Sequence, residues 1–219
     1  MPEIERLGEP AGRDGRGRFL KKAAQKFLLC EYPRITEQET GCVLRLARAV
    51  LPATGGAAMT AFRCVPIATE IADRFRRTGL DDNGNAIKSV EASGAAGRFP
   101  CRHCLRCAAS GQTMLLGSYN LPWPRGIYWT PSPIFLHAEA CARFASENEV
   151  APIVRLNALV SVRAYDAADQ CLYELGHVCS GADVDAPLER ALGDARTAFV
   201  NIHTARPGCL LSRVERIDG

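Results

Sequence analysis

Apolar and polar residues alternate over many short segments in the C-terminal three quarters of the chain. Together with frequent Val, Ile and aromatic residues, this alternation predicts strands over residues 62–67, 113–119, 134–136, 153–165, 171–179, 197–203 and 209–217. Helical periodicity instead predicts short helices over 37–51, 68–77, 137–145 and 185–192. Because the strands follow one another with few crossover helices, we predict an α+β fold with a mainly antiparallel sheet.

The loops between these elements carry turn-forming residues. Residues 81–85 (DDNGN) have the Asp and Asn-Gly composition of a tight turn. Residues 120–133 form a Pro-rich loop that contains both tryptophans of the chain, Trp123 and Trp129. We expect this loop to be either a recognition loop or a lid over the core, and its length favours a functional role.

The N-terminal quarter differs from the rest. Residues 1–18 are rich in Gly and Arg without hydrophobic periodicity, which is typical of disorder. At Met59 the chain enters a strand-like segment (MTAFRCVPI) that reads as the start of a domain. We therefore expect residues 1–58 to be a partly disordered N-terminal extension or a mis-assigned upstream start, and residues 59–219 to form a single α+β domain.

Charge and hydropathy narrow the class of protein. The first 58 residues hold 10 Lys/Arg and 7 Asp/Glu, so they carry all of the net charge of +3. Acidic residues accompany the arginines between 74 and 106, which indicates a mixed surface and argues against nucleic acid as partner. No apolar stretch approaches the roughly 20 residues that span a bilayer, and Arg45 and Arg48 interrupt the one candidate signal segment. We expect a cytoplasmic protein with no membrane contact, whose partner is an unknown ligand or protein.

Ten cysteines are many for a chain in a reducing compartment, where thiols more often bind metal than form disulfides. Cys101 and Cys104 form a CxxC pair (CRHC) that opens a short loop, followed by Gly111 and a strand. His137 and Cys141 are spaced to lie on one face of the helix predicted there. The order CxxC…HxxxC predicts a zinc-knuckle-like insertion with a closed tetrahedral Cys₃His site.

We weigh four alternatives for these residues. Cys107 is also three positions from Cys104 and could replace one of the ligands. His103 could bind as well, although it lies inside the knuckle, where we expect side chains to point outward. A redox-active CxxC would need a strand-to-helix junction, which the pattern does not predict. The cysteines could also be ordinary buried residues.

A second candidate site lies near the C-terminus. Cys209 and His203 could act as a nucleophile and its base, and Arg206 could bind an anion. No acidic residue is placed by the sequence to orient the histidine. A buried cysteine, a strand histidine and a surface arginine would give the same pattern.

Residues 59–219 resemble the bacterial family catalogued as domain of unknown function 1203. The resemblance is carried by FRCVPI at 62–67, PCRHCL at 100–105, MLLGSY at 114–119, PIFLHAEAC at 133–141 and IHTARPGCLLSRVER at 202–216. It implies no established activity. From the residues we expect a binding or regulatory module with a structural zinc site. The alternatives are an enzyme that uses Cys209 and His203 or the metal, and a nucleic-acid-binding protein.

Overall fold

The computed structural model describes residues 60–94 and 99–217. They belong to one compact unit, Gly56–Gly219. The extension expected over residues 1–58, with its helix at 37–51, lies outside the described residues.

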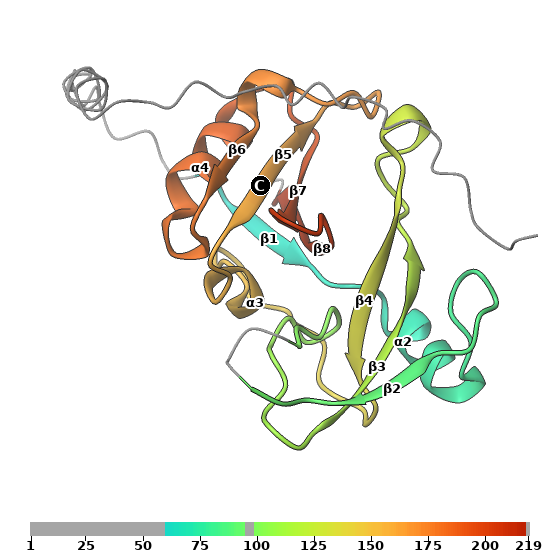
Figure 1. Ribbon diagram of the computed structural model, residues 1–219. Coiled ribbons are helices and arrows are strands. Elements are labelled where there is room, and N and C mark those ends of the chain that lie inside the picture. Colours follow the sequence, from blue (N-terminus) through green and yellow to red (C-terminus); the bar gives the residue numbers. More distant parts are fainter. Residues whose placement is uncertain (1–59, 95–98, 218–219) are drawn as a thin grey trace, which may run out of the picture. The chain divides into compact units, whose positions relative to one another are not determined.

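The larger of two sheets has five strands, all paired antiparallel, in the order β1-β8-β7-β5-β6. These strands are β1 (Phe62–Val65), β5 (Val160–Tyr165), β6 (His177–Cys179), β7 (Phe199–Thr204) and β8 (Leu210–Arg216). The helices α3 (Pro152–Arg155) and α4 (Asp185–Gly193) lie beside this sheet (Figure 1). The 3-10 turns η2 (Tyr173–Leu175) and η3 (Gly181–Asp183) connect β5 to β6 and β6 to α4.

The two faces of the five-stranded sheet differ in polarity because side chains alternate along each strand. Val162 and Ile202 point into a fully buried hydrophobic cluster that includes Leu188 of α4. Their neighbours Arg163, Asn201 and Arg213 occupy the opposite side of the pleat, where Asn201 pairs with both arginines across β5, β7 and β8. The helices therefore cover an apolar face, and the other face carries these polar residues beside the stacked Tyr165 and Phe199.

The smaller sheet has the order β2-β3-β4 and is also antiparallel. Its strands are β2 (Lys88–Glu91), β3 (Thr113–Asn120) and β4 (Pro131–His137), and the loop before β4 contains η1 (Gly126–Tyr128). Helix α2 (Thr69–Thr78) buries Phe75 against Met114, Ile134 and Leu136 in a second hydrophobic cluster. Gly79, with φ 64°, ends the helix in the left-handed conformation that glycine adopts at low cost.

Buried polar contacts join the two sheets. The Leu210 amide at the start of β8 donates to Ser132 Oγ of β4 at 2.9 Å. Arg102, which is 3% exposed, donates from Nε to the Leu210 carbonyl at 2.8 Å. The loop that carries Arg102 is thereby tied to β8 as well as to β4.

The structure confirms the predicted α+β class with mainly antiparallel sheets and few short helices. Four local elements differ from the prediction. Of the strand predicted over 171–179 only His177–Cys179 is a strand, β6, because Tyr173–Leu175 form the 3-10 turn η2. The helix over 137–145 does not form, because His137 ends β4 and the following residues are irregular. The predicted strand at 153–165 begins as helix α3, which Pro152 initiates. Strand β2 was not predicted, since Lys88–Glu91 alternates weakly.

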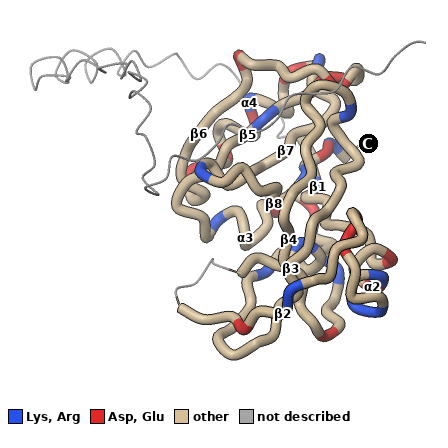
Figure 2. The backbone as a smooth tube through the Cα atoms, turned by 45° about the vertical axis from the view of Figure 1, so that its right-hand side comes forward, with Lys and Arg blue, Asp and Glu red and all other residues tan. Residues whose placement is uncertain are grey.

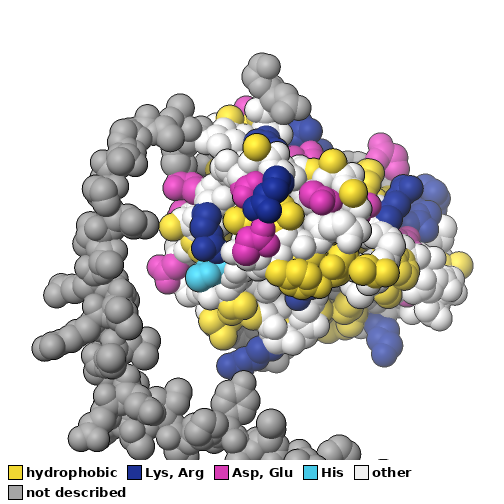
Figure 3. Space-filling view, turned by 90° about the horizontal axis from the view of Figure 1, so that it is seen from above, with side chains coloured by type: hydrophobic (Ala, Val, Ile, Leu, Met, Phe, Trp, Pro, Cys, Tyr) yellow, Lys and Arg dark blue, Asp and Glu magenta, His cyan; other side chains and the backbone are white. Residues whose placement is uncertain are grey.

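The surface mixes both signs of charge. Lys/Arg and Asp/Glu residues are interspersed along the tube in Figure 2, and α2 carries both. The view from above in Figure 3 shows the same mixture around a band of hydrophobic side chains. The exposed large hydrophobic residues include Trp123, Ile127 and Trp129 of the Pro-rich loop. Within the described residues, no helix combines the length and apolarity needed to cross a membrane.

Candidate metal centre

The CxxC pair lies in a tight loop docked on strand β4. The loop closes through the Cys101 amide, which donates to the Arg106 carbonyl at 2.9 Å, and through a bridge between Pro100 and Cys107. Cys101 also forms a parallel bridge with Phe135 of β4. Both thiols of the pair, Cys101 and Cys104, are therefore held in buried positions.

The second pair approaches from β4 without a helix. His137, the last residue of β4, pairs with Met114 of β3. The chain then continues in irregular conformation, and the Phe144 amide donates to the His103 carbonyl at 3.1 Å. This contact holds the segment beside the CxxC loop. Cys141 therefore reaches the site from an irregular segment and not from the predicted helix.

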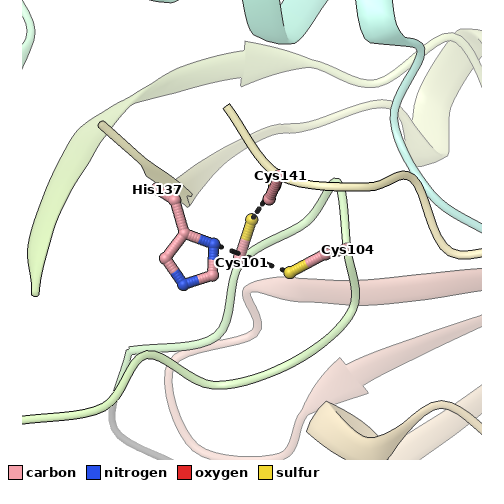
Figure 4. A group of neighbouring side chains, drawn as sticks. All are labelled: Cys101, Cys104, His137 and Cys141. Atoms are coloured by element: carbon pink, nitrogen blue, oxygen red, sulfur yellow. Dashed lines mark hydrogen bonds between the residues drawn. The ribbon is translucent and has the colours of Figure 1, made fainter. Parts of the chain in front are cut away.

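The four donor atoms of Cys101, Cys104, His137 and Cys141 all lie within 4.8 Å of one another. Cys101 Sγ is 3.9 Å from Cys141 Sγ, and Cys104 Sγ is 3.6 Å from His137 Nδ1 (Figure 4). Tetrahedral coordination with Zn–S of about 2.3 Å and Zn–N of about 2.0 Å requires edges of roughly 3.8 Å for S···S and 3.5 Å for S···N. These two measured edges fit a tetrahedral ion.

Close packing of the thiols affects their ionisation. Hydrogen bonds from the Cys104 thiol and backbone N–H groups lower the pKa of Cys101. The same thiol contact raises the pKa of Cys104, and burial raises the pKa of Cys141. Three thiols this close ionise together only when a cation shares their charge, which is the electrostatic role of a bound divalent metal.

Two further side chains, neither assigned to the site from the sequence, contact Cys141. Arg76 of α2 donates from Nη2 to Cys141 Sγ at 3.7 Å and from Nε to the His137 carbonyl at 3.2 Å. His103 Nδ1 lies 3.3 Å from Cys141 Sγ, while its Nε2 lies 3.0 Å from Thr69 Oγ1. His103 is 2% exposed, so the expectation that it points outward is wrong. A CxxC spacing does not indicate which helix supplies such partners.

Cys107 takes a different place. It is half-buried and packs against the cluster of the five-stranded sheet, whereas Cys101 and Cys104 belong to the cluster of the three-stranded sheet. Across residues 60–94 and 99–217, the Cys₃His set is the one group of three or more His, Cys, Asp or Glu side chains close enough to share an ion. The geometry thus favours Cys101 and Cys104 over Cys107.

The C-terminal candidates share one turn between β7 and β8. His203 is 4% exposed, its Nδ1 donates to the Gly208 carbonyl at 2.9 Å, and its buried Nε2 has no partner among the described residues. Burial lowers the pKa of His203 to about 4, so the imidazole is neutral at pH 7. No hydrogen bond joins it to the Cys209 thiol in the described part of the chain, and Arg206 is exposed. The structure brings the three residues near one another without assembling a dyad.

Comparison with known proteins finds a match over the part of the chain that contains the candidate metal centre. The family model described as "Protein of unknown function (DUF1203)" matches residues 98–216, a span that contains all four Cys and His residues and both sheets except β1 and β2. Neither a curated protein nor a solved structure matches the chain. Because the match covers more than half of the 219 residues, the chain belongs to the DUF1203 family.

Proposed function

We propose that Cys101, Cys104, His137 and Cys141 bind one zinc ion with a structural role, and that the domain acts as a binding or regulatory module. The observation that carries the proposal is the fit of the two measured donor edges to a tetrahedral site. Three thiolates and one imidazole are a donor set typical of zinc, and a closed set leaves no position for a substrate or water.

The surroundings of the site support a structural role. Zinc with three thiolates carries one net negative charge, and Arg76 places a guanidinium next to Cys141. Two donors of the set are buried and two are half-buried. The ion would join the CxxC loop, the end of β4 and the segment after it. Since thiolate ligands require reduced cysteines, we also propose a reducing compartment such as the cytoplasm.

The size of the expected effect follows from known zinc sites. Structural zinc contributes about 10–16 kcal/mol in small zinc-finger peptides, whereas whole domains are stable by only about 5–15 kcal/mol. Loss of the ion is therefore expected to unfold at least the three-stranded sheet and the CxxC loop. The cluster around α4 has its own apolar core and should persist longer.

The test combines metal analysis with two cysteine variants. Elemental analysis of protein purified without added metal should give about one zinc per chain. Cys104→Ser should lose the zinc and unfold at least the three-stranded sheet. Cys209→Ser, at a half-buried cysteine outside the set, should retain both the zinc and the folded structure. Metal-free protein with an unchanged near-UV circular dichroism spectrum and melting temperature would refute the structural role.

A further inference from the structure

A cavity of about 340 Å³ lies against the polar face of the five-stranded sheet. Asn201 of β7 and Arg213 of β8 line it from the sheet, and Tyr119 and Asn120 line it from the end of β3. Trp123 of the Pro-rich loop and the connection between β1 and α2 complete the walls. Its volume is at the lower end of the range for small-molecule sites.

Three buried polar atoms at this cavity have no partner within the described residues: Asn201 Oδ1, Asn120 Oδ1 and Arg213 Nη1. Asn201 is 1% exposed, and its Nδ2 donates to the Trp123 carbonyl at 3.4 Å, which leaves the oxygen as the unpaired atom. Asn120 likewise donates from Nδ2 to Asn83 Oδ1 at 3.3 Å. Each buried unpaired group costs about 1–3 kcal/mol, so three at one cavity indicate that something absent from the chain itself satisfies them.

The guanidinium of Arg213 is held in place by its neighbours. It stacks 4.5 Å from the ring centroid of Trp123 and 4.2 Å from that of Phe199. Its Nε lies 2.8 Å from Glu215 Oε1 as an ion pair without hydrogen-bond geometry. With the position fixed and Nη1 unpaired, Arg213 is oriented to receive an anionic oxygen such as a carboxylate.

The polar groups at the cavity include donors and acceptors: Arg143, which donates to the Ile67 and Pro66 carbonyls, and the Tyr119 hydroxyl also line it. The two amide oxygens require N–H or O–H donors from a ligand. Asp82 and Glu215 also line the cavity, but Asp82 is ion-paired with Arg74, and Glu215 with Arg63 and Arg213. The remaining walls are apolar, with Ile67 and Leu121 among them.

We propose that this cavity binds a free α-amino acid with an apolar side chain, its carboxylate on Arg213 and its ammonium on the oxygens of Asn201 and Asn120. The apolar walls would receive the side chain. This inference names the ligand class of the proposed binding module and rests on that part of the proposal alone, since it needs no metal.

The test measures binding of L-phenylalanine and L-leucine to the full chain as purified, by calorimetry. Phenylalanine amide lacks the carboxylate and N-acetylphenylalanine lacks the ammonium, so each should bind at least about tenfold more weakly than the parent. No detectable binding of either amino acid at about 10 mM would overturn the proposal, as would equal binding of the amide, which points to an apolar contact only.

Two variants and a control locate the site. Arg213→Gln should weaken phenylalanine binding at least about tenfold without changing the binding of the amide. Asn201→Leu removes the unpaired oxygen and should weaken binding while the melting temperature stays the same or rises. Arg125→Gln is the control, because Arg125 lies over the same Trp123 ring but is exposed and outside the cavity lining. A loss of binding in the control equal to that in Arg213→Gln would contradict the assignment.

Zinc content measured on the same samples separates the two proposals. Zinc-containing protein that binds no amino acid refutes only the ligand assignment. Folded zinc-free protein that binds phenylalanine refutes only the structural zinc.

Discussion

His203 gives the stability of the domain a calculable pH dependence. In the unfolded chain the imidazole has an ordinary pKa of about 6.5, and in the folded chain burial lowers the pKa to about 4. Between these values the unfolded state binds a proton that the folded state does not, so stability falls as pH falls from 6.5 towards 4. Above pH 6.5 the imidazole is neutral in both the folded and the unfolded chain, so His203 contributes no pH dependence there.

Linkage gives the magnitude. With those two pKa values, the contribution of His203 to the free energy of unfolding drops by about 2 kcal/mol between pH 7 and pH 5 and by about 3 kcal/mol at pH 4. The fully buried position, with the Gly208 carbonyl as its hydrogen-bond acceptor, makes no room for a solvating water around the charged form.

The variant His203→Asn isolates this contribution. Its amide nitrogen can still donate towards Gly208, but it does not titrate, so its cost is the same at every pH. Urea unfolding at pH 7, 6 and 5 should show the difference between wild type and variant shrinking by about 2 kcal/mol. A difference for His203→Asn that does not change with pH would refute the assignment of a neutral buried imidazole.

Two further substitutions test the metal centre and the core. Arg76→Met removes the donor to Cys141 and should weaken zinc binding about 10–100-fold, measured by competition with a chromophoric chelator. Arg77→Met, at an exposed position on the same helix, should leave the zinc affinity unchanged. Equal zinc affinities in both variants and the wild type would exclude a role for Arg76 at the site. Gly181→Ala would place a Cβ 1.9 Å from the Val154 carbonyl oxygen and should destabilise the domain by at least about 2 kcal/mol in urea unfolding. A Cβ at Gly193 would meet nothing within 4 Å, so Gly193→Ala should not destabilise the domain. Similar losses of stability in both variants would contradict the packing described.

Alternation was sufficient to predict most strands. Residues 197–203 and 209–217 form β7 and β8 within two residues at each end, because Val200, Ile202, Leu211 and Val214 recur at every second or third position and are buried. The helix predicted over 137–145 does not form. The Phe144 amide donates to the His103 carbonyl and holds the segment in an irregular path, and such a long-range contact leaves no local pattern.

Part of the candidate site could likewise be predicted from the sequence, and part could not. The four Cys and His residues could be predicted as a set, since two short spacings restrict which thiols can meet. Arg76 could not, because α2 reaches Cys141 only through tertiary packing. The sequence makes His103 a candidate ligand, but its buried contact with Cys141 depends on the path of the chain after β4. The cavity at Arg213 was anticipated only through its Pro-rich loop. Two residues that line the cavity, Asn201 and Tyr119, come from strands about 80 residues apart in the sequence. They lie at one cavity only because of the arrangement of the two sheets.

In the proposed site, three sulfurs and one nitrogen hold one zinc ion. Zinc K-edge X-ray absorption on the purified protein tests this coordination most directly. The structure predicts about three Zn–S distances near 2.3 Å and one Zn–N distance near 2.0 Å, with no oxygen neighbour. Protein without zinc, or a zinc shell with two or fewer sulfurs or with a bound water, would contradict the closed structural site.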